Sequence, residues 1–214
     1  MPRPSIARRQ SGFTLIEIAI VLVIIGLLLG GILKGQELIN SARVKNLAAD
    51  FRNIPLFIYG YQDKFRVLPG DDANAVAHVG TATVTPGAGD GDGVIDGNWN
   101  STTVTDESFL FWQHVRLAGL APGPTTTGAT DYLPRNAVGG TVGIQSTAPF
   151  TGMTGGTYYV CSTTILGKFA KQLDIQLDDG NTATGAMRAG TTLPTAVDTE
   201  DIDDSTPYTV CMGI

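Results

Sequence analysis

A nearly unbroken apolar run close to the N-terminus limits what this chain can fold into. Across residues 13–33 every side chain is apolar, glycine or alanine, except Thr14 and Glu17. A run of this length reaches the roughly 20 residues that a helix needs to cross the hydrocarbon of a bilayer. It is therefore predicted to be a transmembrane helix, and the rest of the fold must be placed around it.

Basic residues ahead of the apolar run set its expected orientation. The arginines before it are Arg3, Arg8 and Arg9, and basic residues beside a span mark its cytoplasmic side. We expect a cytoplasmic N-terminus, with everything after residue 33 outside. A cleaved secretory signal has a shorter apolar core followed by a small-residue cleavage site. Here the core is long and the only fitting cut lies before it, so ordinary signal peptidase is a poor match.

The carboxylate of Glu17 needs a physical reason. An acid in hydrocarbon costs about 2.5–3.5 kcal/mol on insertion scales, and such groups usually have a partner. No lysine, arginine or histidine lies in residues 13–33. A cut between Gly12 and Phe13 would create an ammonium group at Phe13, near the depth of Glu17 on a staggered neighbouring helix. Cleavage would thus supply a partner for the acid.

The stretch GFTLIE at residues 12–17, after a short basic leader and before an apolar run, resembles the type IV prepilin signature. Type IV pilins and the pseudopilins of type II secretion systems share this signature. The resemblance implies cleavage after Gly12 by prepilin peptidase, methylation of the new Phe13 amine, and a role for Glu17 in assembly. The alternative is an uncut single-span anchor whose Glu17 snorkels to the cytoplasmic interface.

The same resemblance implies a function. The chain would be a structural subunit, a major or minor pilin, of a type IV pilus-like filament. It would wait in the bacterial inner membrane as a precursor and then join other pilins, of its own or another kind, on an inner-membrane assembly platform to form a periplasmic or extracellular filament. One alternative is a pseudopilin of a type II secretion system, and another is an uncleaved membrane-anchored binding or adhesin protein.

Beyond the span the pattern predicts a helix that continues into a globular head. Apolar residues recur at spacings of three and four, which indicates one buried helix face. These residues are Val44, Leu47, Phe51, Ile54, Ile58 and Tyr61. Pro55 is expected to kink or interrupt the helix. We divide the chain into a leader (1–12), a transmembrane helix (13–33), its amphipathic continuation (34–65) and a head (66–214).

Local patterns in the head predict an α+β fold. Residues 107–120 are expected to form a second helix, with acids in the first turn and Gly119 near its end. Four segments bounded by Gly, Pro or Asp are predicted strands, namely residues 140–147, 156–164, 171–177 and 207–214. The expected architecture is a long N-terminal helix packed on a C-terminal antiparallel β-sheet head.

The two cysteines, Cys161 and Cys211, each lie within a predicted strand. A bridge between them would tie the last strand to the sheet, and the outside location permits oxidation. The alternative is a pair of buried free thiols. We expect the disulfide.

A glycine-rich acidic loop, GDGDGVIDG at residues 89–97, is a candidate calcium site. Asp90, Asp92 and Asp96 could supply the oxygen ligands that calcium takes from flexible turns. Placed on the EF-hand pattern, however, the first and twelfth ligand positions fall on Ala88 and Trp99. The alternative is a solvated acidic turn, and calcium is the one cofactor that the sequence suggests.

Charge and residue types exclude other functions. With 14 basic and 20 acidic residues and a net charge of −6, the chain lacks the basic surface that nucleic acid binding requires. The sequence has no HExxH, no nucleophile elbow and no Cys-rich metal spacing. Of its two histidines, His114 is expected on the surface of the second helix or half-buried. We therefore predict no catalytic residues, no enzymatic activity and no direct contact with nucleic acid.

Overall fold

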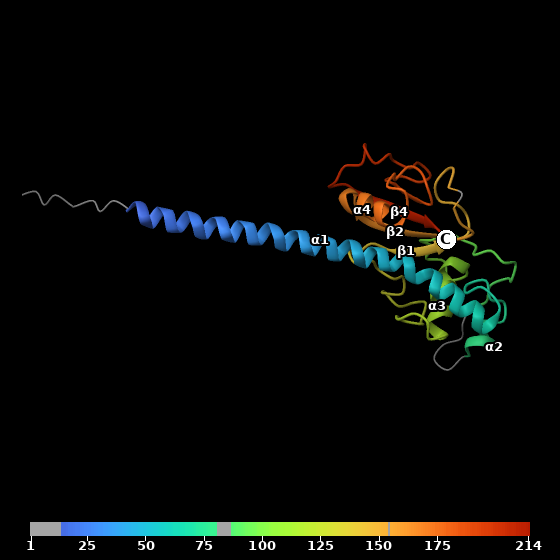
Figure 1. Cartoon of the computed structure of the whole chain (residues 1–214). Coiled ribbons are helices and arrows are strands. Elements are labelled where there is room, and N and C mark those ends of the chain that lie inside the picture. The colour runs from blue at the N-terminus through green and yellow to red at the C-terminus, as the bar shows by residue number, and fades with distance from the viewer. Residues whose placement is uncertain (1–13, 81–86, 154) are drawn as a thin grey trace, which may run out of the picture. The chain divides into compact units, whose positions relative to one another are not determined.

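The computed structural model describes residues 14–80, 87–153 and 155–214, and these fall into two compact units that divide between Ser41 and Ala42. The first helix, α1 (Leu15–Phe65), begins in the first unit and ends in the second. The second unit holds the other helices, α2 (Ala75–Val79), α3 (Glu107–Leu117) and α4 (Gly167–Leu177), together with all four strands (Figure 1). We call the second unit the head.

The head is built on the last part of α1. All six residues of the predicted stripe are buried, as is Ala48, and six of these seven belong to the main hydrophobic core. The predicted interruption at Pro55 is wrong, because α1 is continuous through it. Ile54 and Ile58, either side of the proline, are each only 2% exposed. Their packing outweighs the hydrogen bond that the proline removes.

A four-stranded antiparallel sheet faces this helix across the core. Its strands are β1 (Val142–Gln145), β2 (Tyr159–Leu166), β3 (Met187–Gly190) and β4 (Pro207–Gly213), in the order β1-β2-β4-β3. Every neighbouring pair is antiparallel. The core joins α1 side chains to sheet residues such as Ile144, Val160 and Val210. The predicted α+β architecture of a long helix with an antiparallel sheet is confirmed.

One predicted strand is a helix. Residues 171–177 lie in α4, where Phe169, Ala170 and Leu173 are buried and Ile175 is 70% exposed. The alternation of Leu173, Ile175 and Leu177 suggested a period of two, but burial follows the helical spacing between Phe169 and Leu173. The strand that pairs with the other side of β4 is instead β3, a short segment that the sequence pattern did not reveal.

The cysteines of the two central strands form a disulfide. Cys161 on β2 and Cys211 on β4 are direct partners in the strand register, and both are fully buried. Trp99, Phe150, Met153 and Tyr159 surround them in a second, smaller apolar cluster. The expected disulfide is confirmed, and it fixes the C-terminal strand in the sheet.

We expect the double substitution Cys161→Ala and Cys211→Ala to lower the free energy of unfolding of the head by about 2–4 kcal/mol. The bridge closes a loop of 50 residues, and its loss returns conformational entropy to the unfolded chain. Denaturant titration followed by tryptophan fluorescence would measure this, because Trp99 and Trp112 both lie in the head. Reduced wild-type protein should match the variant, and a variant as stable as oxidised wild type would contradict the prediction.

Candidate functional site

The described part of the apolar run is a fully exposed helix. Large apolar side chains between Leu15 and Ile39 are 46–92% exposed. The best 18-residue window of α1 has a mean hydropathy of 2.9, and none of that window is buried. Its length and composition suffice to cross a membrane. So much exposed apolar surface on a folded chain indicates a lipid or protein environment that covers it.

Glu17 caps the start of this helix. Its Oε2 accepts hydrogen bonds from the backbone N–H of Thr14 (2.8 Å) and from the Thr14 hydroxyl (2.8 Å). The backbone N–H of Glu17 donates in turn to Thr14 Oγ1 (3.3 Å). These reciprocal bonds form a capping box, whose sequence pattern is Thr-x-x-Glu. Thr14 was not among the predicted site residues, although the pattern was present at residues 14–17.

Four glycines interrupt the apolar stretch at positions 26, 30, 31 and 35. They lie inside α1, where glycine costs about 1 kcal/mol relative to alanine. A Cβ built at any of them would have no neighbouring atom within 4 Å. Nothing in the described chain therefore explains their small size. Their spacing gives two Gly-x-x-x-Gly pairs, Gly26 with Gly30 and Gly31 with Gly35, and this pattern is typical of close helix contact in membranes.

The two residues of the expected cleavage site, Gly12 and Phe13, lie outside the described residues. The first described residue is Thr14, and α1 begins at Leu15. The expected cleavage after Gly12 and the methylation of Phe13 therefore stay predictions. Glu17 is the one member of the predicted assembly site with a described geometry.

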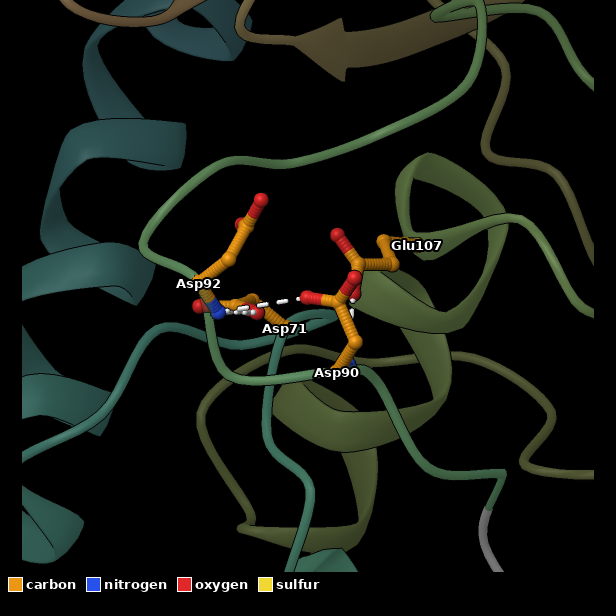
Figure 2. A group of neighbouring side chains, drawn as sticks. All are labelled: Asp71, Asp90, Asp92 and Glu107. Atoms are coloured by element: carbon orange, nitrogen blue, oxygen red, sulfur yellow. Dashed lines mark hydrogen bonds between the residues drawn. The ribbon is translucent and has the colours of Figure 1, made fainter.

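The acidic loop of the head meets two carboxylates that the sequence analysis did not assign to it. Carboxylate oxygens of Asp71, Asp90, Asp92 and Glu107 lie within 4.8 Å of one another. Figure 2 shows how they converge from the turn after α1, the loop itself and the first turn of α3. We call these four residues the α3 acidic cluster. Asp71 is 4% and Glu107 5% exposed, whereas Asp90 and Asp92 are exposed.

Backbone N–H groups donate hydrogen bonds to the two buried members of the α3 acidic cluster. Asp71 accepts from the N–H groups of residues 91, 92 and 93 at 2.6–3.0 Å. Glu107 accepts from the N–H groups of Asp90 and Asp96, both at 2.9 Å. Asp71 thus holds the loop to the turn after α1, and Glu107 holds it to α3. Burial raises the pKa of both carboxyl groups, as do nearby carboxylates, and the amide hydrogen bonds partly offset this rise.

The three predicted calcium ligands are only partly brought together. Asp90 and Asp92 belong to the α3 acidic cluster, whereas Asp96 does not. Asp96 lines a pocket of about 350 Å³ with Asp90 and Glu107. The partners that complete the group, Asp71 and Glu107, come from either side of the loop in sequence. Acids in the Leu-Pro-Gly-Asp-Asp turn and in the first turn of α3 were the available signals.

His114 lies next to this loop and is fully buried, so its predicted surface or half-buried position is wrong. Its Nδ1 accepts from the backbone N–H of Gly70 (2.9 Å), and its Nε2 donates to the carbonyl of Gly87 (2.8 Å). The ring therefore connects the turn before Asp71 to Gly87, two residues before the acidic loop. These two bonds require the neutral ring with its proton on Nε2.

We expect protonation of His114 to destabilise the head. Burial lowers its pKa below the ordinary value of 6.5, so the unfolded chain binds the proton more readily than the folded one. The stabilisation that His114 provides is then complete above pH 6.5 and is lost as the pH falls below it. His114→Asn should be less stable than wild type at pH 7.5 by about 1–3 kcal/mol, and this difference should shrink toward pH 5.

Urea titrations between pH 5 and 7.5 would measure the difference. His78→Asn is the matched control, because it leaves His114 as the remaining histidine of the two in the chain. This control should keep the dependence that belongs to His114. A stability gap between wild type and His114→Asn that stayed constant with pH would contradict the prediction.

A comparison with protein-family models found a match in the N-terminal segment of the chain. Residues 7–33 match a family model described as the prokaryotic N-terminal methylation motif. Searches of curated proteins and of solved structures found no match. The matched residues contain Arg8 and Arg9 of the leader, the expected cleavage site, the Thr14–Glu17 capping box and the first part of the exposed apolar helix. This chain therefore carries the N-terminal signature of a type IV pilin- or pseudopilin-like precursor.

Proposed function

We propose that this chain is a structural subunit, a major or minor pilin, of a type IV pilus-like filament. The observation that carries the proposal is the match over residues 7–33. From Leu15 on, the matched segment is a helix whose large apolar side chains are exposed in the described chain. Prepilin peptidase would remove residues 1–12 from the inner-membrane precursor. The freed helix would then pass from lipid into the core of a filament with other pilins on its assembly platform.

Helix packing would drive the assembly. In lipid, helices gain little by leaving one apolar environment for another, so they associate through close contact at small residues. Gly26, Gly30, Gly31 and Gly35 offer such contact, and their cost to an isolated helix is offset only where a neighbour packs on them. The apolar residues around them would form the remaining surface that a filament core buries.

Glu17 would have a different partner at each stage. In the described chain its carboxylate is held by the Thr14 amide and hydroxyl. After cleavage, the ammonium group at Phe13 of a neighbouring subunit could approach the same oxygens. A carboxylate has room for several donors, because its two oxygens offer about four acceptor positions. The capping box would thus keep the side chain near the helix start, ready for an intersubunit contact.

Two other functions remain as alternatives with distinct outcomes. A pseudopilin of a type II secretion system would carry the same signature and form a short periplasmic filament. An uncleaved anchor would present the head as a binding or adhesin protein. Long surface fibres containing this chain would support the pilus, and fibres seen only when the subunit is overproduced would support the pseudopilus. The head is proposed to act as a surface module, without enzymatic activity and without binding nucleic acid directly.

The calcium site at Asp90, Asp92 and Asp96 stays a prediction. The hydrogen bonds of Asp71 and Glu107 organise the loop by themselves. In the proposed function a calcium ion would stabilise this part of the head and take no part in assembly through α1.

Substitutions at Glu17 would separate its charge from its capping role. Glu17→Gln keeps an oxygen that can accept from Thr14, but it removes the charge. We expect Glu17→Gln and Glu17→Ala both to be cleaved and both to reduce filament yield at least about tenfold. Thr14→Ala removes a cap worth about 1 kcal/mol and leaves the charge, so it should assemble more like wild type. Sheared filaments measured against total protein would give the yield.

One result would contradict the proposed role of the Glu17 charge. If Glu17→Gln assembled as well as wild type while Thr14→Ala failed, capping rather than charge would be the contribution of this residue. The proposed contact with the Phe13 amine would then be wrong.

The N-terminus of the mature protein tests processing directly. We expect protein purified from membranes or filaments to begin at Phe13 with one methyl group on its amine. Mass spectrometry of the N-terminal peptide would detect both changes. Gly12→Ala should still be cut, because it adds a single methyl group, whereas a bulky or charged residue there should block cleavage. Wild-type filaments that retained residues 1–12 would contradict the proposal and favour the uncut anchor.

A further inference from the structure

A second group of acids lies at the C-terminal end of α4, away from the loop that suggested calcium in the sequence. Carboxylate oxygens of Asp174, Asp178 and Asp179 lie within 4.8 Å of one another. Asp174 is on the last full turn of α4, and Asp178 and Asp179 follow its end. We call these three residues the α4 acidic site. Asp174 lies in the segment that was wrongly predicted as a strand, and none of the three acids was a predicted site residue.

Asp174 is the residue that needs an explanation. It is 0% exposed. Its Oδ1 accepts from the backbone N–H of Gly180 (2.7 Å), but its Oδ2 is buried and accepts no hydrogen bond from a donor among the described residues. The Asp179 carboxylate is close enough to bond to Asp174, but only if one of the two acids carries a proton. A buried carboxylate oxygen without a partner is costly, and native proteins seldom leave one so. Its neighbours make the cost larger, since two more carboxylates lie beside it.

The local backbone adds further negative charge. The C-terminal end of a helix carries partial negative charge on its unpaired carbonyl groups, so basic residues usually occur there. The last turn of α4 contains no basic residue. None of the ion pairs in the described residues involves the α4 acidic site, and Lys171 on the same helix pairs with Asp204 (2.9 Å). Three acids thus face the negative end of a helix without a compensating side chain.

Hydrogen bonds hold the other two carboxylates in place. Asp178 Oδ2 accepts from the backbone N–H of Met187 (2.7 Å). Asp179 accepts from the backbone N–H of Asn181 (2.9 Å) and from the hydroxyl of Thr184 (2.8 Å). Gly185 adopts a positive φ of 67°, and a Cβ at this position would collide with the Asp178 carboxylate. The loop is therefore shaped so that it approaches the acids closely without covering them with a side chain.

We propose that the α4 acidic site binds a divalent cation, Ca²⁺, through Asp174, Asp178 and Asp179. Ca²⁺ takes six to eight oxygen ligands at about 2.3–2.6 Å, so two oxygens on one ion lie at most about 5 Å apart. The spacing of the three carboxylates meets this limit. The ion would partner Asp174 Oδ2, neutralise the helix end and join α4 to the loop that leads into β3. Backbone carbonyls and water would supply the remaining ligands.

This site is independent of the proposed function. Binding would stabilise the head whether or not the chain forms a filament. Solvent can reach the site, because Asp179 is exposed and Asp178 half-buried.

Calcium binding to the full chain in detergent micelles, after removal of metal with EDTA, tests the proposal. Isothermal titration with CaCl₂ should detect binding to wild type. At ten times the dissociation constant, Ca²⁺ should raise the melting temperature of the head by about 3–5 °C. The double variant Asp178→Asn and Asp179→Asn should weaken this binding at least about tenfold. Asp174→Asn should do the same, because it keeps the shape of the side chain and removes its charge.

Asp90→Asn with Asp92→Asn is the matched control, since it removes two charges from the α3 acidic cluster. This variant should keep the binding that the α4 variants lose. Circular dichroism and the melting temperature in EDTA would show that each variant folds. Two results would overturn the proposal: wild type without calcium binding up to 10 mM, which would leave Asp174 to be neutralised by a proton, or binding that only the Asp90 and Asp92 variant loses.

Discussion

The fold depends on the burial of one face of α1. Residues spaced three and four apart between Val44 and Tyr61 are at most 5% exposed, and all of them except Tyr61 belong to the main hydrophobic core. This packing holds the helix continuous through Pro55 and gives the sheet a surface to face. Further toward the N-terminus the same helix has apolar residues on every side and no cover. α1 therefore has two parts. The C-terminal part has one apolar face, which packs into the core of the head, whereas the N-terminal part has apolar residues on all sides and requires lipid or other protein to cover them.

The elements that the sequence predicted correctly are those with a clear period or a strong local signal. The buried face of α1, the helix after residue 106 and the strands around Ile144, Val160 and Val210 all have one. The errors come from tertiary contacts. Residues 171–177 alternate like a strand, but packing of Phe169 and Leu173 makes them helical. His114 is a polar residue on a helix, but it is buried because two backbone groups distant in sequence form hydrogen bonds with its ring nitrogens.

The functional sites, like the fold, were predictable only where local sequence determines them. The prepilin signature was readable because its residues are contiguous, and residues 7–33 match a known motif. The α3 acidic cluster was only half predicted, since Asp71 and Glu107 bind loop amides that lie 11–22 residues away in sequence. At the α4 acidic site the wrong secondary structure concealed the group, because a strand would place Asp174 and Asp178 on one face without closing the turn at Gly180. Carboxylates that folding brings together from distant positions leave no local pattern in a single sequence.

The carboxylates of this chain differ in their hydrogen-bond partners. This difference separates carboxylates with a structural role from those for which we propose a functional one. Asp71 and Glu107 accept several backbone amides, so their charge serves the loop that they hold. Glu17 accepts from Thr14 alone within the described chain and keeps one oxygen free of any such bond. Asp174 keeps a buried oxygen with no donor. Amide hydrogen bonds satisfy Asp71 and Glu107. Glu17 and Asp174 each keep an oxygen without such a bond, and neither forms an ion pair among the described residues. For Glu17 the proposed partner is a neighbouring subunit's amine. For Asp174 it is Ca²⁺, because a buried oxygen beside two further carboxylates at a helix end suits the oxygen coordination of this cation.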